Sequence, residues 1–265
     1  MKSLLKRLLP WHLRRTVAYA RTSYASRKPP FQGVYPDFGM IKQTPGYSDQ
    51  GWSESSKFAA KRARDQIGTK IPSVMPHSKN LLPILVASLK GPVRILDFGG
   101  AAGLDFGNLS ASLGGIPKDV SYMVVDTAGT CAAGRSIWES ENIAFTSELP
   151  AETERFDIVY AYSAIQYLDD FRHGLKKFAA YQPEAILLCH HPVYFGESFV
   201  RCQSNMGAGL EVAQWVFGFD DLIETMSDLG YQLSFREYTP AEYNVDNYAD
   251  DAKAGRTANL MFVPK

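Results

Sequence analysis

A glycine-rich turn after a short apolar segment constrains the fold of this chain more than any other feature. Residues 93–98 read Val-Arg-Ile-Leu-Asp-Phe, and residues 99–103 continue as Gly-Gly-Ala-Ala-Gly. An apolar strand that turns sharply into a helix opens a βαβ unit, and the glycines let the backbone approach a ligand closely. The pattern predicts further strands at 121–126, 142–146, 156–162 and 185–189, with helices at 104–113, 128–139 and 169–181. This alternation predicts an α/β fold with a Rossmann-like, doubly wound sheet.

The length and composition fit one such domain with appendages. The chain has 265 residues, of which 45% are apolar, so a sizeable core can form. We divide it into a basic amphipathic N-terminal helix (1–28), an N-terminal arm with helices (29–90) and a ligand-binding domain (91–265). The arm is predicted to contain helices at 53–67, with Ser53 as the N-cap, and at 78–90. Residues 192–218, rich in glycine and aromatic side chains, form either a lid insertion over the substrate or an irregular packed loop.

The formal net charge of zero hides an uneven distribution. Residues 1–28 contain eight basic and no acidic side chains, whereas the rest of the chain contains 20 basic and 28 acidic ones. The leucines between the basic residues recur at helical spacing, so this segment either touches an anionic membrane surface or packs against the domain or a partner. The acidic body argues against nucleic acid as a partner. No apolar run is long enough for a secretory signal or a membrane span.

The three cysteines indicate the cellular compartment of the protein. Cys131, Cys189 and Cys202 are an odd number without metal-type spacing, which excludes a disulfide scaffold and a zinc site of paired cysteines. We therefore expect no metal and a reducing compartment: the cytoplasm, with peripheral contact at the inner face of the membrane if residues 1–28 bind lipid. The sequence does not indicate an oligomeric state.

Asp97, two residues before the first glycine, indicates the kind of ligand. A carboxylate at this position would repel the pyrophosphate of a dinucleotide, but it suits a ligand with a cationic end. S-adenosylmethionine has an ammonium and a sulfonium group and no phosphate. Gly99, Gly100, Ala101 and Gly103 would form the turn around it. The alternative is that Asp97 only caps the turn.

Other candidate ligand contacts follow the later strands. Asp126, with the adjoining Thr127, ends strand 121–126, where an acid can accept both ribose hydroxyls of NAD or S-adenosylmethionine, or can cap the next helix. Ser147 and Glu148 follow strand 142–146, where adenine edges are often contacted. Because ligands bind outside the carboxyl ends of the strands, Ser163 and Gln166 should lie near the reacting centre if strands 93–98 and 156–162 are neighbours.

Together these features resemble the class I S-adenosylmethionine-dependent methyltransferases. The residues that carry the resemblance are Leu96-Asp-Phe-Gly-Gly-Ala-Ala-Gly103, Asp126, Phe156-Asp-Ile-Val159 and Ala164-Ile-Gln-Tyr-Leu168. Residues 219–229 are predicted to be helical. Strands 231–237 and 258–263 fit that fold's terminal antiparallel pair, which implies a seven-stranded, mostly parallel sheet. The chain departs from the family pattern at Ala101, which replaces the middle glycine and narrows the space for the methionine part of the ligand.

Within the class, the chain is similar to bacterial methyltransferases associated with surface-polysaccharide biosynthesis genes. This looser resemblance covers Phe31-Gln-Gly-Val-Tyr-Pro36, Gly51-Trp52, Gln166-Tyr-Leu168, Phe199-Val-Arg-Cys-Gln203, Gly230-Tyr231 and Ala258-Asn-Leu-Met-Phe262. It implies a small-molecule or glycan-type acceptor.

The chemistry of methyl transfer suggests catalytic residues. Transfer to a hydroxyl oxygen benefits from a general base, and His190 and His191 directly follow strand 185–189, so either could serve. The alternative for both is a hydrogen bond to loop backbone. No Asn/Asp-Pro-Pro-aromatic sequence follows strand 156–162, which argues against methylation of nucleic-acid amines. Two other functions stay open: an S-adenosylmethionine-binding adaptor without catalysis, and an NAD-dependent oxidoreductase on a similar sheet.

Overall fold

The structure is a computed structural model, and it describes most of the chain. The described residues are 30–42, 44, 50–69, 79–138, 142–204, 211–240, 247–248 and 256–265. The predicted amphipathic helix at 1–28 lies outside the described residues, so a membrane contact through it stays a prediction. Among the described helices, none combines the length and the apolar character needed to cross a membrane.

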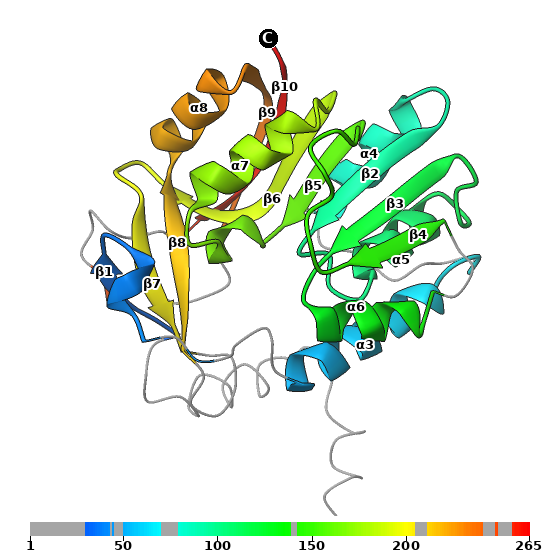
Figure 1. Ribbon diagram of the computed structural model, residues 1–265, viewed down its shortest axis with the longest axis horizontal. Helices are drawn as coiled ribbons and strands as arrows, with labels where there is room; N and C mark the ends of the chain where they lie inside the picture. Colours follow the sequence, from blue (N-terminus) through cyan, green and yellow to red (C-terminus); the bar gives the residue numbers. More distant parts are fainter. Residues whose placement is uncertain are drawn as a thin grey trace, which may run out of the picture.

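The centre of the molecule is the predicted doubly wound sheet (Figure 1). Five parallel strands stand in the order β4-β3-β2-β5-β6, and the antiparallel strand β10 pairs with β6 and with β9. Their bounds are β2 Val93–Phe98, β3 Val120–Val125, β4 Ile143–Thr146, β5 Ile158–Tyr162, β6 Ala185–Tyr194, β9 Tyr231–Pro240 and β10 Arg256–Pro264. Because β2 lies between β3 and β5, the chain reverses its direction of winding beside the glycine turn, which is where such sheets bind ligands.

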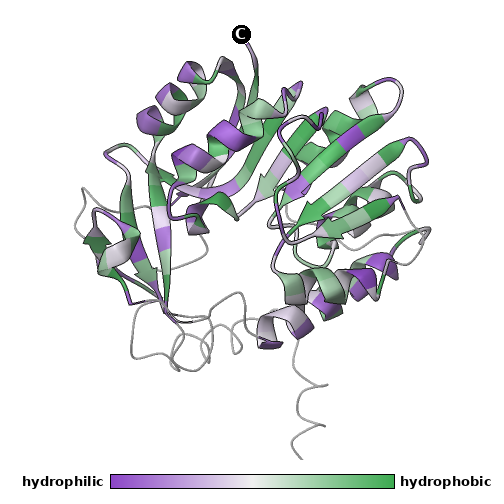
Figure 2. Cartoon of the chain, in the orientation of Figure 1, coloured by the Kyte–Doolittle hydropathy of each residue, from purple (hydrophilic) through white to green (hydrophobic). Residues whose placement is uncertain are grey.

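Helices cover both faces of this sheet. On one face, α7 (Phe171–Ala180) and α8 (Phe219–Asp228) pack through Phe171, Phe178 and Leu222. On the other face are α4 (Leu81–Ser88), α5 (Leu104–Ser112) and α6 (Ala128–Arg135), with α3 (Gln50–Arg64) packed outside α5 and α6. Strands buried on both faces read as continuous apolar runs, and Figure 2 shows the central strands mostly in the hydrophobic colour.

Three strands beyond the predicted seven extend the sheet, and they correct the prediction for 192–218. Residues 192–194 belong to β6, and β7 (Phe199–Gln203) pairs antiparallel with β8 (Val212–Gly218), which is buried throughout. β8 joins the end of β6 in parallel, and β1 (Phe31–Tyr35) pairs with β7. The described part of this segment is therefore mostly sheet, in place of the irregular loop, and its role as a lid stays a prediction. In Figure 1 these strands and η1 (Phe38–Met40) stand opposite α3 and α6, across the carboxyl ends of the parallel strands.

Two predictions for the arm need correction at the level of boundaries. The first helix begins at Gln50, so Ser53 lies inside it and is not its N-cap. Ser53 instead packs against α6, where a Cβ atom on Gly129 would stand 3.1 Å from the Ser53 hydroxyl. The second helix, α4, is shorter than predicted, and Lys79 lies just ahead of it. Outside the arm, α7 begins after Asp170, whose Oδ1 accepts a hydrogen bond from the His173 N–H at 2.9 Å and caps the helix.

Candidate active site

The edge of the sheet where β2 and β5 end, beside residue 190 within β6, is marked by unusual backbone conformations. Four non-glycine residues in the described part of the chain have positive φ angles, and three lie here: Ala101 at 54°, Ser163 at 51° and His190 at 58°. A non-glycine residue in this region costs on the order of 1–3 kcal/mol, and such residues gather at functional sites. Three of them on three neighbouring strands indicate one site at this edge of the sheet.

The glycine turn is packed so closely that side chains would not fit. A Cβ atom on Gly99, whose φ is +71°, would stand 2.4 Å from the Ala164 Cβ after β5. A Cβ atom on Gly100 would stand 2.1 Å from Asp97 Oδ2. Gly103 ends the turn with φ +82° as the residue before α5. The turn thus brings the end of β2, the start of α5 and the segment after β5 together, as the sequence predicted.

The Asp126 side chain links the glycine turn to the end of β3 through hydrogen bonds. Its Oδ2 accepts a hydrogen bond from the Ala101 N–H at 2.9 Å, and its Oδ1 accepts one from the Thr127 N–H at 2.7 Å. The bond to Ala101 helps to hold this residue at its positive φ. Burial raises the pKa of Asp126, and hydrogen bonds from Thr127, Ala101 and Thr130 partly offset this rise. Asp126 stays partly accessible, so a ligand could still reach it.

Asp97 lies beneath the turn and is fully buried. Tyr122 donates a hydrogen bond to Asp97 Oδ2 at 2.8 Å, while Oδ1 has no partner among the described residues. Burial, followed by the nearby charge of Asp105, raises the pKa of Asp97 well above its usual range. A buried carboxyl oxygen without a hydrogen-bond partner costs free energy. Such groups are typical of sites where a ligand supplies the missing partner.

Ser163 and Gln166 lie together after β5. Gln166 belongs to the short helix η4 (Ile165–Tyr167), is 1% exposed and donates to Ser163 Oγ at 2.7 Å. The Gln166 Oε1 atom has no partner among the described residues. Ser147 and Glu148, by contrast, follow the edge-side strand β4 and are exposed. The structure therefore gathers the turn, Asp126, Ser163 and Gln166 at one edge, with Ser147 and Glu148 on the surface beside it.

The two histidines differ in their surroundings, and neither follows the strand as predicted, because β6 continues to Tyr194. His190 is partly exposed, and its ring stacks on Tyr162 at the end of β5, with ring centres 5.2 Å apart. His191 is completely buried, and its Nε2 accepts long hydrogen bonds from the N–H groups of Ala164 and Ile165. Burial, with a smaller effect from His190, lowers the pKa of His191 to about 3.

A bulge in β6 sets the direction of His190, and the sequence pattern did not reveal it. The register between β10 and β6 shifts at Asn259, whose Oδ1 accepts a hydrogen bond from the His190 N–H at 2.9 Å. Asn259 is buried and donates in turn to Glu237 Oε2 on β9 at 2.7 Å. Bulges next to active sites commonly redirect a side chain. Here the bulge gives His190 its positive φ and turns two consecutive histidines to different surroundings.

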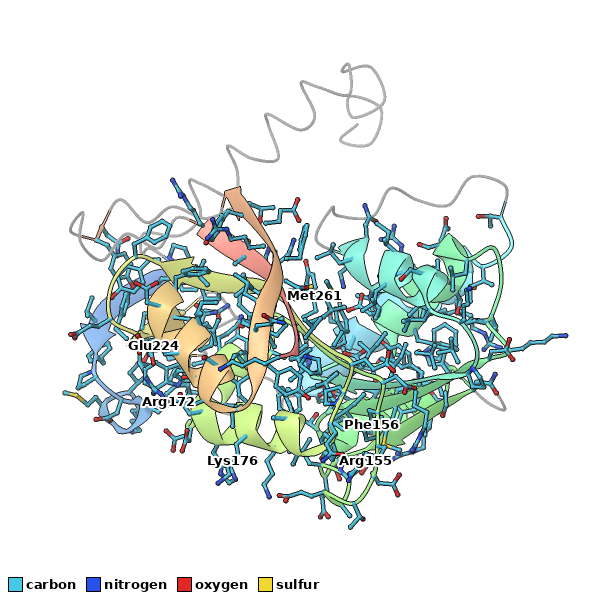
Figure 3. All side chains as sticks on the ribbon, turned by 90° about the horizontal axis from the view of Figure 1, so that it is seen from above. Arg155, Phe156, Arg172, Lys176, Glu224 and Met261 are labelled. Carbon is cyan, nitrogen blue, oxygen red and sulfur yellow. The ribbon has the colours of Figure 1, made fainter. Side chains whose placement is uncertain are left out.

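Arg172 and Lys176 of α7 and Glu224 of α8, which are labelled in Figure 3, line a hollow of about 500 Å³ away from this edge of the sheet. Its acidic and basic groups face one another. Arg172 pairs with both oxygens of Asp221, at 2.5 and 2.6 Å. We assign no ligand to this hollow, because its lining mixes acidic and basic side chains and, among the described residues, holds no buried polar atom without a partner.

Comparison with known proteins supports the architecture. No protein-family model matches the chain, and no curated protein matches it. One similar solved structure comes from the complex between the Haloferax volcanii Trm112 methyltransferase activator and a methyltransferase; it is 13% identical, with a TM-score of 0.55, and covers 84% of this chain and 97% of its own.

Another similar structure is the Burkholderia thailandensis 1,6-didemethyltoxoflavin-N1-methyltransferase, solved with 1,6-didemethyltoxoflavin and S-adenosylhomocysteine. It is 15% identical, with a TM-score of 0.52, and covers 91% of this chain and 97% of its own. Likeness at this level of identity establishes the fold. The chain therefore has the Rossmann-like α/β fold of the class I methyltransferases, with a mostly parallel sheet that ends in antiparallel strands.

Proposed function

We propose that this protein is an S-adenosylmethionine-dependent methyltransferase that acts on a small-molecule or glycan-type acceptor. The observation that carries the proposal is that three strained residues lie at one edge of the sheet: Ala101 and Ser163 just after β2 and β5, and His190 at the same level within the adjacent β6. Strained backbone conformations persist only where the surrounding packing fixes them. Three of them at one edge of the sheet are expected where a ligand and a reacting group must be positioned.

The residues at this edge suit S-adenosylmethionine better than a dinucleotide. Gly99 and Gly100 have no side chains, so a ligand could approach the backbone of the turn closely. The Oδ1 atom of Asp97, which lies beneath the turn without a partner among the described residues, favours an ammonium group and disfavours a pyrophosphate. Asp126 lies at the end of β3, where it would accept the ribose hydroxyls, and the exposed Ser147 and Glu148 would lie beside the adenine. When bound, this cofactor supplies a methyl group on a sulfonium, ready for displacement by a nucleophile.

His190 is our candidate general base for a hydroxyl acceptor. It is partly exposed at the ligand edge, and its stacking on Tyr162 and its backbone bond to Asn259 fix its position. The ring would accept the proton that leaves the acceptor oxygen as the methyl–oxygen bond forms. His191, which is fully buried, instead holds η4 through the backbone N–H groups of Ala164 and Ile165 and so positions Ser163 and Gln166.

Binding of S-adenosylhomocysteine tests the cofactor assignment without any knowledge of the acceptor. Asp126→Asn should weaken its binding roughly thirtyfold, because a charge-assisted hydrogen bond contributes about 2 kcal/mol. Asp119→Asn is the matched control, since this exposed carboxylate lies just before the other end of β3. Calorimetry should give wild-type affinity for Asp119→Asn. Equal affinity for both variants would remove Asp126 from the cofactor site.

Turnover tests the reaction and its acceptor class. The purified protein is incubated with labelled S-adenosylmethionine and with nucleotide-sugars or lipid-linked glycans, because surface-polysaccharide synthesis is the role that the sequence resemblance suggests. We expect label in a glycan hydroxyl. His190→Gln should slow transfer by roughly 100-fold while cofactor affinity stays within twofold of wild type. Transfer only to unrelated acceptors would contradict the glycan assignment.

Two other functions predict different results in the same experiments. A non-catalytic adaptor would bind S-adenosylhomocysteine tightly and release none from S-adenosylmethionine with any cell extract. An NAD-dependent oxidoreductase would be stabilised against heat by NAD more than by S-adenosylmethionine. The vacant oxygen of Asp97 beneath the turn suits an ammonium group, which S-adenosylmethionine has and NAD lacks.

A further inference from the structure

A buried cluster of three charged groups lies beneath the glycine turn. Lys79, just ahead of α4, forms an ion pair with Asp105 of α5, and the exposed fractions of the two side chains are 10% and 9%. Asp97 of β2 is the third member and is fully buried. Neither Lys79 nor Asp105 stood out in the sequence, where each resembles an ordinary surface residue near a helix start.

The two carboxyl groups of this cluster differ in the number of polar partners that they have. Among the described residues, Lys79 pairs with Asp105 and lies 3.9 Å above the centre of the Tyr162 ring, and it forms no ion pair with Asp97. Asp105 also accepts a long hydrogen bond from Tyr160, at 3.4 Å, and a bond from Asn108. Asp97 has only the hydroxyl of Tyr122 on Oδ2 and none on Oδ1. The one ammonium in the cluster therefore pairs with Asp105, and Asp97 has no ion-pair partner among the described residues.

The titratable groups that face Asp97 come from each element packed around it. They are Asp105 of α5, Tyr122 of β3, Asp126 after β3, Tyr160 of β5, and Lys79, with Cys189 of β6 next to Tyr160. With both carboxylates ionised and both tyrosines neutral, Lys79, Asp97 and Asp105 carry a net charge of −1. A buried site of that kind takes up a proton or a cation. The raised pKa of Asp97 agrees with a proton there when no ligand is bound.

We infer that Lys79 and Asp105 set the charge of Asp97, so that the site exchanges one proton for the ammonium group of its ligand. The inference rests on the proposed function, since the ligand is the amino-acid end of the cofactor. In the free protein, Asp97 holds the proton on a carboxyl oxygen. When the ammonium group arrives at the turn, the O–H bond breaks, the proton leaves to the buffer, and the carboxylate faces the cation. The three residues plus their proton or ligand cation are neutral in both states.

The test measures protons released on binding. The full-length protein is titrated with S-adenosylhomocysteine in phosphate and in Tris, whose ionisation enthalpies differ, at several values from about pH 5 to 8. We expect up to one proton released per ligand bound. Affinity should rise by as much as tenfold per pH unit below the pKa of Asp97 in the free protein and level off above it. The control ligand is 5′-methylthioadenosine, which keeps the adenosine and the sulfur but has no ammonium group, and it should release none.

Two variants separate this mechanism from simple burial. Asp105→Asn frees the Lys79 ammonium to compensate Asp97, so binding should persist without proton release. Lys79→Met removes the cation and should extend proton release to higher pH, whereas Lys118→Met, at an exposed lysine ahead of β3, should behave as wild type. The outcomes separate this inference from the proposed function. If the wild-type protein binds S-adenosylhomocysteine and releases no proton at any pH tested, the inference is wrong while the cofactor assignment stands. Equal release with 5′-methylthioadenosine would also overturn it. No binding of S-adenosylhomocysteine at all would contradict the proposed function itself.

Discussion

Gly100→Ala is expected to destabilise the protein by about 3 kcal/mol and to weaken S-adenosylhomocysteine binding at least roughly tenfold. The new methyl group would stand 2.1 Å from Asp97 Oδ2 and 2.4 Å from Asp97 Cγ. Asp97 is fully buried, and Tyr122 holds its Oδ2 with a hydrogen bond that any movement would disturb. Either the carboxylate or the turn must therefore shift, and each shift disturbs the place of the ligand.

Gly115→Ala is the matched control for this substitution. Gly115 follows α5, its φ is not in the left-handed region, and a Cβ atom there would meet nothing within 4 Å. The control therefore introduces the same methyl group without the clash, and it should change the unfolding free energy by less than about 1 kcal/mol. Denaturant unfolding and calorimetry measure the two effects. If Gly100→Ala matched Gly115→Ala in both measurements, the close packing of the turn on Asp97 would be contradicted.

Much of the fold was predictable because its signals are local. The run from Val93 to Gly103 is strand, turn and helix in one short stretch, and each boundary depends on residues a few positions apart. The alternation of strands and helices predicted a parallel, doubly wound sheet, and the structure supplies the order of its strands. The prediction that Asp97, Asp126, Ser163 and Gln166 gather at one edge needed only the rule that parallel strands end at the same side.

The parts that sequence did not predict depend on distant pairings. The buried strand β8 was read as part of a loop because the segment around it is rich in glycine and aromatic residues, and its partner β7 pairs in turn with β1, far away in the sequence. The predicted strand 185–189 stopped too early, because two histidines and a proline interrupt the apolar run. The bulge that carries His190 depends on Asn259, 69 residues further along the chain.

His191→Gln should reduce the fall of the unfolding free energy as the pH is lowered. Because burial lowers the pKa of His191 to about 3, the folded protein keeps this ring neutral, while the unfolded chain binds a proton below about pH 6.5. Protons then favour the unfolded state, so the stability contributed by His191 is present above about pH 6.5 and is lost as the pH falls toward 3. By pH 5 the loss is about 2 kcal/mol relative to pH 8.

Glutamine suits this test because its Oε1 can accept the N–H bonds of Ala164 and Ile165 that Nε2 now accepts. Denaturant unfolding at several pH values gives the curves, and the difference between wild type and variant isolates the contribution of this ring. His173→Gln, at an exposed histidine of α7, should leave the wild-type curve unchanged. A wild-type ring of His191 whose NMR signals titrate near pH 6.5 would contradict the prediction without any variant. A ring that stays neutral to low pH is the behaviour expected of a residue that holds η4 in place, and it leaves His190 as the histidine able to exchange protons with an acceptor.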